Sequence, residues 1–406
     1  MKWDMTEIRI RKLFGRFNYD FDMGDMIKSG MIILSGPNGF GKTMILECLN
    51  AISNSDLFFF LQLNFESFEI RRNEVDKQIK IVKKNNGLCV NGEELSYKDI
   101  NLSSRGIVER SSDDEEATKQ RAAKVRVILD YMQSVLGSIQ YIKGQRLVDI
   151  DDSRIAVSRQ GELRRYSRRI LETVNKIPEE FRMQMRSLDS LYSVKSNELD
   201  RTFLKRLFEL KEGIDEETFK QKIELVRGKI QKLSESGISK LGTLDVTQFR
   251  EEDARALKIY FEDFDEKYRV YEKMIEQIGL FKKIVDERFL FKHLEITNGQ
   301  NLAIVDDDTQ ERIDLNKLSS GEQEILVLYY RLLFEIPEGS IVLIDEPEIS
   351  LHIAWQRKFA QDLQEIVKLR NLFAIVATHS VQIVSGNRHI QYDLGEMYKN
   401  GFNKRE

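Results

Sequence analysis

The chain has 406 residues, of which 41% are hydrophobic, and its 63 basic and 67 acidic side chains give a net charge of −4. This composition excludes a wholly disordered chain, and the near balance of charge excludes a globally basic surface, so any nucleic-acid interface must be a local patch. The four prolines are few for this length and favour long helices over a loop-rich β-fold.

Two cysteines, Cys48 and Cys89, are too few and too far apart for a disulfide framework or a metal-binding spacing. The longest apolar run, residues 57–61, is too short to span a membrane, and the N-terminus lacks the apolar stretch of a signal peptide. We therefore expect a soluble, cytoplasmic protein.

Residues 1–150 are predicted to form a first, β-rich lobe. Alternating apolar residues predict strands at EIRIRKLF and FNYDFDM around a turn at Gly15, followed by a buried strand that ends at Ser35. More strands are expected at residues 65–72 and 78–95, with a hairpin turn at Asn85-Asn86-Gly87. The acidic run Ser111–Glu116 is interpreted as a solvated loop.

Residues 151–290 are predicted to form a helical insertion, because the apolar period changes from two to about 3.5. One apolar series runs from Phe219 to Leu233 and a second from Leu257 to Ile278. We expect these two segments to form an antiparallel coiled coil joined near Ser234–Thr247. A further helix is expected to begin at Pro178, in its first turn.

Residues 291–406 return to a strand pattern and are predicted to form a second lobe. The triple aspartate Asp306-Asp307-Asp308 invites a metal hypothesis, but a solvated hairpin tip is the better interpretation because no further ligand is suitably spaced. The chain is thus expected to be an α/β protein whose two lobes are separated by the helical insertion.

A glycine-rich segment follows the strand that ends at Ser35 and precedes an apolar helix. It reads GPNGFGKT and consists of Gly36, Pro37, Asn38, Gly39, Phe40, Gly41, Lys42 and Thr43. This is the GxxxxGK[ST] phosphate loop, whose backbone N–H groups and helix N-terminus bind phosphates. We expect Lys42 to reach the β- and γ-phosphates of ATP and Thr43 to bind Mg²⁺.

A second candidate segment, SIVLIDEPEIS, places Asp345 and Glu346 at the end of a buried strand. Open α/β sheets bind ligands at this end of their strands. Asp345 suits a water-mediated contact with Mg²⁺, and Glu346 suits a general base that polarises the attacking water. Taken alone, the two acids could also be ordinary turn residues, although this is the less favoured interpretation.

Between these segments lies LSSGEQ, which supplies Ser319, Ser320, Gly321 and Glu322 at the start of an apolar helix. The serines can cap the helix, and Gly321 permits close approach of the backbone to an anion. As an isolated hexamer it would suit a helix-capping box. Placed about 20 residues before the strand of Asp345, it resembles the signature motif of ABC-type ATPases.

This resemblance implies an ABC-type ATPase head interrupted by a coiled-coil insertion, and it implies two further site residues. Gln145, in YIKGQRL, matches the glutamine that senses Mg²⁺ and the attacking water. His379, in the segment ATHS, matches the histidine that contacts the γ-phosphate. The segment Glu348–His352 departs from the aspartate that transporters carry there, which favours the OLD, RecF and SMC-like branch.

Within that branch the chain resembles the PtuA ATPases of Septu-type and retron-associated anti-phage systems, through phrases such as DERFLFKHLEI and DEPEISLHIAWQ. The resemblance implies an ATPase that controls a separate effector, which we expect to be an HNH nuclease. OLD nucleases continue into a further domain after the histidine, whereas 27 residues follow it here. We therefore expect the effector to act in trans.

The resemblance also implies that two copies pair head to tail, with Ser319 and Gly321 of one copy covering ATP held by Lys42 and Thr43 of the other. Higher oligomers are expected to build on this dimer. The alternative function is a DNA-repair or chromosome-associated clamp of the RecF or SMC type. A structural scaffold without ATP turnover is disfavoured by the complete set of motifs.

Two sets of residues are further candidates. A basic cluster around Tyr166 would suit contact with nucleic-acid phosphates, although a solvated helix face or a protein interface is as good an interpretation. This cluster consists of Arg164, Arg165, Arg168 and Arg169. Near the first hairpin, Phe14, Arg16 and Phe17 are candidates for stacking on the adenine ring.

Overall fold

The computed structural model describes residues 5–72, 77–100, 115–143, 159–238, 248–297, 301–349 and 351–403. Contacts divide the chain into two compact units, one made of Met1–Asp149 with Ile336–Glu406 and the other of Ile150–Glu335. The second unit thus contains both the helical insertion and the segment LSSGEQ. The predicted division at residue 290 stays a prediction.

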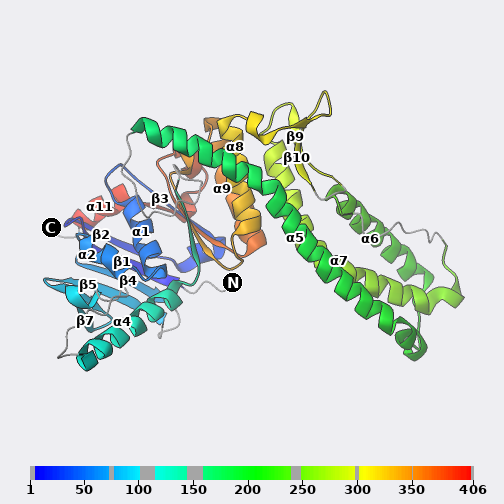
Figure 1. Ribbon diagram of the computed structural model, residues 1–406, viewed down its shortest axis with the longest axis horizontal. Coiled ribbons are helices and arrows are strands. Elements are labelled where there is room, and N and C mark those ends of the chain that lie inside the picture. The colour runs from blue at the N-terminus through cyan, green and yellow to red at the C-terminus, as the bar shows by residue number, and fades with distance from the viewer. Residues whose placement is uncertain are drawn as a thin grey trace. The chain divides into compact units, whose positions relative to one another are not determined.

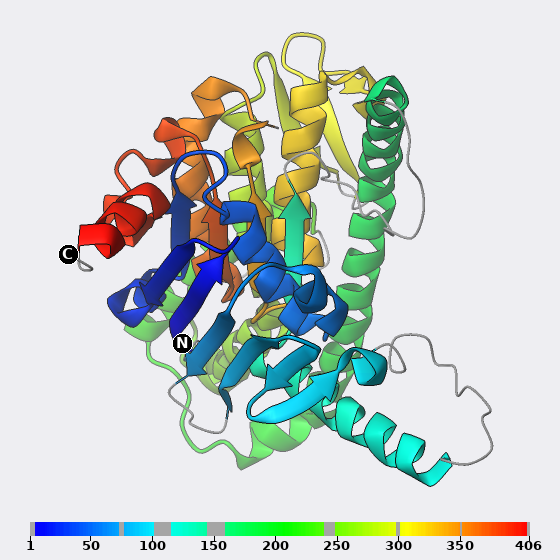
Figure 2. The same ribbon diagram turned by 90° about the vertical axis from the view of Figure 1, so that its left-hand side faces the viewer.

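The first unit contains a six-stranded antiparallel sheet with the order β2-β1-β4-β5-β6-β7 (Figure 2). Its strands are β1 (Met5–Leu13), β2 (Phe17–Asp22), β4 (Ser67–Arg72), β5 (Ile79–Lys84), β6 (Gly87–Val90) and β7 (Glu93–Ser96). The predicted turn at Asn85-Asn86 joins β5 to β6 and is confirmed. Gly87 is required there, because a Cβ would lie 1.9 Å from the carbonyl oxygen of Leu95.

The first unit also contains a five-stranded parallel sheet with the order β14-β3-β13-β12-β8. Its strands are β3 (Met31–Ser35), β8 (Ile139–Lys143), β12 (Ile341–Asp345), β13 (Phe373–Ala377) and β14 (Gln391–Asp393). Every residue of β3, β12 and β13 is buried, as expected for the centre of a parallel sheet. The predicted α/β fold is confirmed, with the antiparallel strands forming a sheet of their own.

Helices of the first unit pack on the sheets. They are α1 (Lys42–Ser53), α2 (Leu57–Gln62), α4 (Glu115–Leu136), α9 (Ile353–Arg370), α10 (Val381–Val384) and α11 (Leu394–Asn403). Of these, α1, α2, α4 and α11 contribute to one apolar core with the sheets. Helix α1 packs against β8, β12 and β13, and α9 packs against β13. Because α1 begins at Lys42, within the glycine-rich segment that follows β3, this segment connects the end of β3 to the N-terminus of the helix.

The second unit is built on two long helices, α5 (Arg159–Glu209) and α7 (Ala254–Asp286), which lie side by side in Figure 1. They run antiparallel, since Asp189 near the middle of α5 bonds to Tyr271 of α7, whereas Arg206 near the end of α5 bonds to Asp263. The predicted apolar series on α7, from Leu257 to Ile278, is buried.

The 219–233 and 257–278 segments pack on one another as predicted, but the predicted antiparallel direction is wrong. Helix α6 (Glu216–Glu235) runs parallel to α7, because Phe219 packs on Phe261 while Lys229, further along, pairs with Asp265 and lies over Tyr268. The antiparallel partner of α7 is α5. A 3.5-residue period identifies which face of a helix is buried, but it does not identify the helix that covers it.

The predicted helix start at Pro178 is also wrong, because this proline lies inside α5. A proline within a helix removes one hydrogen bond at a cost of about 3 kcal/mol. The apolar face of α5 nevertheless continues across it, with Val174 and Ile177 before Phe181 and Met185, all buried. Tertiary packing of this face outweighs the local cost of the proline.

The second unit also contains a three-stranded sheet of β9 (Lys292–Ile296), β10 (Leu302–Asp306) and β11 (Arg312–Ile313), followed by α8 (Ser320–Tyr330). The triple aspartate forms the turn between β10 and β11, where the carboxylate of Asp306 accepts hydrogen bonds from the N–H groups of Asp308 and Thr309. The prediction of a hairpin tip is confirmed. Among the described residues, no cluster of acidic, histidine or cysteine side chains suits a metal ion.

A search of the described helices finds none that is both long enough and apolar enough to cross a membrane.

Removing Arg206 should destabilise the α5–α7 pair, because its guanidinium contacts both carboxylate oxygens of Asp263, which is 8% exposed. We expect Arg206→Ala to cost about 1–3 kcal/mol, because it leaves a buried charge unpaired. Lys195→Ala, which breaks exposed pairs with Glu198 and Glu266, should cost less than about 1 kcal/mol. Hydrogen exchange of α5 and α7 measures both, and equal effects would contradict the expectation.

Candidate active site

Four strands of the parallel sheet end at one edge, and their register places the final residues in a row. Asp345 of β12 pairs with Ala377 of β13 and with Lys143 of β8, and Ala377 pairs in turn with Leu34 of β3. The segments that follow these strands therefore meet at the carboxyl edge of the sheet, where such sheets bind ligands. The predicted Gln145 follows β8 but lies outside the described residues.

The glycine-rich segment connects β3 to α1. Gly36, Gly39 and Gly41 have φ angles of 137°, 82° and 89°, in the region that side chains disfavour. Gly41 is also required by space, because a Cβ there would lie 2.7 Å from Cδ2 of Leu13. The remaining residues before the helix are Pro37, Asn38 and Phe40. A turn of this kind followed by a helix N-terminus is suited to phosphate binding.

The ammonium group of Lys42 lies over this turn. Its Nζ donates hydrogen bonds to the carbonyl oxygens of Gly36, at 2.9 Å, and Pro37, at 3.3 Å, and lies 3.2 Å from Nδ1 of His379. The residue is 4% exposed, and burial lowers the pKa of its ammonium group despite the nearby carboxylates of Glu346 and Glu348. A cation is thus held where the glycine-rich turn would receive phosphates.

Asp345 is buried beside two hydroxyl groups. The Thr43 hydroxyl donates to Oδ1 at 3.1 Å and the Tyr141 hydroxyl to Oδ2 at 3.3 Å. Burial raises the pKa of the Asp345 carboxyl group to about 6, although these hydrogen bonds oppose the shift. A carboxylate and a threonine hydroxyl that converge in this way fit Mg²⁺, which prefers oxygen ligands and retains several waters.

Glu346 and His379 follow neighbouring strands, and their side chains face one another. Nε2 of His379 lies 3.6 Å from Oε1 of Glu346. Because Lys42 can only donate a hydrogen bond, Nδ1 of His379 must accept it, and the ring proton then resides on Nε2, toward Glu346. The backbone of Glu346 has a φ of +50°, a strained conformation that often marks functional residues. Its side chain is 36% exposed, which leaves it accessible to water.

The predicted signature residues lie in the second unit, at the N-terminus of α8. Ser319 and Glu322 form a helix-capping box, which was one of the two interpretations of this segment from the sequence. The serine hydroxyl lies 2.9 Å from the Glu322 carboxylate, which also accepts the Ser319 N–H at 2.9 Å. Ser320 and Gly321 form the first turn of the helix between them. Burial opposes ionisation of Glu322, but Lys292 and Ser319 hold its pKa below the usual value.

A sequence profile of the AAA ATPase domain family matches residues 12–384, which is most of the chain. The protein belongs to this ATPase family. Its arrangement is that of an ABC-type phosphate-loop head, with the glycine-rich segment after β3, the paired acids at the end of β12 and a histidine after β13, interrupted by a helical segment.

Other similarities are more remote. Protein ea59 of Escherichia phage lambda is 32% identical over 106 residues, which cover 26% of this ATPase and only a fifth of the length of the phage protein. The Smc head domain of Pyrococcus furiosus, solved with the C-terminal domain of ScpA, is 14% identical with a TM-score of 0.38 and covers 94% of this chain and 91% of its own. The SMC head domain of Thermotoga maritima is 12% identical with a TM-score of 0.36, covering 94% and 92%. TM-scores this low do not support a conclusion about the function of this chain.

Two side chains of the ATPase site were not predicted in these positions. Tyr141, on β8, donates to Asp345, and its own pKa is raised by burial and by that carboxylate. Glu348 accepts hydrogen bonds from the N–H of His379 and from the hydroxyl of Thr378. The sequence offered a clue to Tyr141, because this residue lies in the segment YIKGQRL that was singled out for Gln145. Nothing in the sequence indicated that the side chain of Glu348 contacts Thr378 and His379.

The structure describes the predicted adenine-stacking residues but not the side chains of the predicted basic cluster. Phe17 is 6% exposed and packs against Phe40 and Tyr398, so it is not available for adenine stacking, and Phe14 and Arg16 remain exposed. The basic cluster of Arg164, Arg165, Arg168 and Arg169 belongs to α5, but its side chains lie outside the described part.

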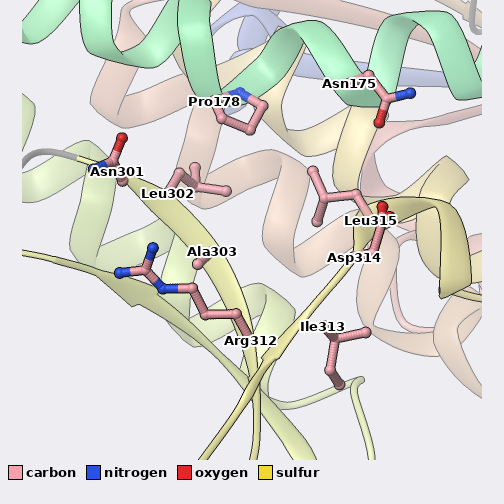
Figure 3. A pocket seen from close by; sticks show the side chains of 9 residues that line it. All are labelled: Asn175, Pro178, Asn301, Leu302, Ala303, Arg312, Ile313, Asp314 and Leu315. Atoms are coloured by element: carbon pink, nitrogen blue, oxygen red, sulfur yellow. The ribbon is translucent and has the colours of Figure 1, made fainter.

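A pocket of about 360 Å³ lies within the second unit of the ATPase, between α5, β10, β11 and the turn that precedes LSSGEQ (Figure 3). It is lined by Asn175, Pro178, Asn301, Leu302, Ala303, Arg312, Ile313, Asp314 and Leu315. Its rim is tied by a hydrogen bond of 3.0 Å from the amide of Asn175 to that of Asn316. None of the predicted nucleotide-binding residues lines this pocket, so it is distinct from the candidate active site.

Asp345→Asn should stabilise the nucleotide-free ATPase. The wild-type carboxylate is 7% exposed and contacts neutral hydroxyl groups, so its charge is costly, whereas asparagine keeps an oxygen that accepts from Thr43. We expect a gain of about 1–2 kcal/mol, or about 2–4 °C in the thermal unfolding midpoint at pH 7.5. Asp20→Asn, at an exposed ion pair with Arg11, is the control and should not raise the midpoint. A lower midpoint for Asp345→Asn would contradict the expectation.

Proposed function

We propose that the protein hydrolyses ATP at the carboxyl edge of its parallel sheet and uses this cycle to control a separate effector in anti-phage defence. The observation that carries the proposal is the convergence of Lys42, His379 and Glu346, with Thr43 and Asp345 beside them. This set brings a phosphate-binding cation, a candidate base and a magnesium-binding pair to one place. Membership of the ATPase family supports the same reaction.

In the proposed reaction, Gly36–Thr43 bind the β- and γ-phosphates through backbone N–H groups and the ammonium group of Lys42. Lys42 then exchanges its contacts with Gly36, Pro37 and His379 for phosphate oxygens. Glu346 takes a proton from the attacking water, and the water oxygen forms a bond to the γ-phosphorus while the bond to the β-phosphate oxygen breaks. ADP and phosphate leave, and the proton on Glu346 returns to solvent.

His379 is suited to stabilise this step. Its Nε2–H faces Glu346 before ATP binds, and departure of Lys42 frees its Nδ1. A histidine between the base and the phosphate can donate a hydrogen bond to the charge that develops on the γ-phosphate. Thr43 and Asp345 would hold Mg²⁺, which would neutralise charge on the phosphates. Gln145 is proposed to complete this set.

The second element of the proposal is ATP-dependent pairing of two copies, head to tail. The phosphate loop and LSSGEQ belong to different units of the chain. Ser319, Ser320, Gly321 and Glu322 present the N-terminus of α8, which is suited to face an anion. In the proposed dimer these residues cover the γ-phosphate of ATP bound to the other copy, so that hydrolysis loosens the interface.

The third element is the biological role, which rests on the likeness to PtuA ATPases. Binding of ATP would assemble the heads, and the α5–α7 pair would transmit their opening and closing to an HNH nuclease or another toxin. Contact with DNA through Arg164, Arg165, Arg168 and Arg169 is part of this proposal. A charge reversal at Arg165 and Arg168 that left DNA binding unchanged would remove that part.

Lys42→Ala should abolish ATP binding, because it removes the cation that neutralises the phosphates, while Glu346→Gln should bind ATP but not release it. Mass photometry with Mg²⁺ and ATP tests the pairing: the Glu346→Gln protein should form a persistent dimer and Lys42→Ala should remain as it is without nucleotide. Lys77→Ala, remote from the phosphate loop in sequence, serves as the charge control. A Lys42→Ala protein that dimerises with ATP like the wild type would overturn the proposal.

The neighbouring genes would distinguish a role in anti-phage defence from a role in DNA repair. An adjoining gene for a small nuclease, whose product co-purifies with the ATPase and changes the mass of the assembly when ATP is added, supports effector control. A DNA-stimulated ATPase with no such partner would instead indicate the RecF or SMC type of clamp.

A further inference from the structure

The carboxylate of Glu348 is hydrogen-bonded directly to Thr378 and His379, at the start of the loop after β13. Its Oε1 accepts the backbone N–H of His379 at 2.6 Å, and its Oε2 accepts the hydroxyl of Thr378 at 2.7 Å. Both oxygens are therefore occupied by donors on the loop that follows β13. Hydrogen bonds to an ionised carboxylate are short and about twice as strong as neutral ones, so this contact holds the loop firmly.

The sheet itself does not hold His379 in place. The last backbone bond from β13 to its neighbour is donated by Thr378 to the carbonyl of Leu34, at 3.0 Å. The N–H of His379 is bonded to the carboxylate of Glu348 and not to a strand. Without Glu348, the N–H of His379 would lose this partner, and the imidazole would be held less firmly at its position 3.2 Å from Lys42 and 3.6 Å from Glu346.

Two further ties make the loops after β12 and β13 one unit. The N–H of Glu346 donates to the carbonyl of Ala377 at 2.8 Å. The amide of Gln356 donates to the carbonyl of Leu351 at 3.0 Å, and its oxygen accepts the Ser380 hydroxyl at 2.7 Å. These ties flank His379 on either side, whereas Glu348 is bonded to its N–H. The two acids, which are two residues apart, thus differ in their contacts. The side chain of Glu346 is accessible to water, whereas each carboxylate oxygen of Glu348 accepts a hydrogen bond from the loop after β13.

We propose that Glu348 is the positioning residue of the ATPase, which holds His379 at the distance from Glu346 and Lys42 that hydrolysis requires. This inference rests on the proposed ATP hydrolysis. Glu348 is less suited than Glu346 to act as the base, since both of its oxygens already accept hydrogen bonds from its own chain. Its effect on the reaction passes through His379.

Steady-state kinetics with ATP and Mg²⁺, together with the Kd of a non-hydrolysable ATP analogue, test the proposal. Glu348→Ala should lower kcat roughly 10- to 100-fold, because misplacement of a positioned group costs that order of rate. The Kd of the analogue should change less than about threefold, since Lys42 and Thr43 are untouched. An equal loss in Kd and kcat would indicate general damage to the fold and overturn the proposal.

Two conservative variants distinguish a loss of positioning from a loss of folding. Glu348→Gln retains an oxygen for the His379 N–H and an amide group that can donate to the Thr378 hydroxyl, so it should recover most of the rate. Thr378→Val removes one of the two bonds to Glu348, together with the acceptor of the Ser380 N–H, and should cost only a few-fold. A Glu348→Gln protein as inactive as Glu348→Ala would overturn the positioning role.

The decisive comparison is made in a His379→Ala background. If Glu348 acts through His379, Glu348→Ala should cause little further loss of kcat there, because coupled residues are strongly non-additive. The same loss in both backgrounds would overturn the proposal. Failure of ATP hydrolysis itself is distinguishable: it would appear as an inactive wild type, or as full activity of Glu346→Gln, whereas normal activity of Glu348→Ala alone refutes only the role of Glu348.

Discussion

Ile344 of β12 pairs with Val376 of β13, and Val376 pairs with Ile33 of β3, so a single parallel register determines where three loops begin. Successive residues of a strand point to opposite faces, so a shift of one residue would turn Asp345 away from Thr43. Burial of all three strands holds the register, since a slip would disrupt the packing on both faces. The chemistry of the edge thus depends on packing in the middle of the sheet.

The same edge carries a cost in stability. Lys42 and Asp345 are both nearly excluded from water, and burial disfavours the charged form of each. Nucleotide and Mg²⁺ would bring charges opposite to those of Lys42 and Asp345, so their binding would offset a penalty that folding has incurred. The left-handed backbone of Glu346 adds to this cost.

Sequence reasoning identified the parts of this site that depend on local chemistry. The glycines of residues 36–41 and the buried strand before Asp345 are encoded within a few neighbouring residues, and the structure places them as predicted. The contact of Glu348 with His379 spans 31 positions and depends on the turn after β12, which no local pattern specifies. The hydroxyl of Tyr141 reaches Asp345 only because β8 and β12 are neighbours in the sheet.

In the helical unit, the buried faces of the helices could be predicted from the sequence, but the way in which the helices pair could not. Its buried faces were predicted, because apolar spacing reports burial directly, and the burial of Phe261 and Tyr271 bears this out. The contact of α6 with α7 was predicted, but the antiparallel partner of α7 was not, since α5 and α6 both offer apolar faces. Polar contacts such as Tyr271 with Asp189 select the antiparallel partner, and Pro178 is tolerated because packing on either side of it is continuous.

The central claim is that Glu346, held beside His379, activates water for ATP hydrolysis. Its most direct test is a single-turnover time course of phosphate release from ATP and Mg²⁺, with wild-type and Glu346→Gln proteins at equal ATP occupancy. The account predicts that the wild type releases phosphate and that the glutamine variant retains intact ATP, slowed at least about 100-fold. Phosphate release at the same rate from both proteins would contradict it.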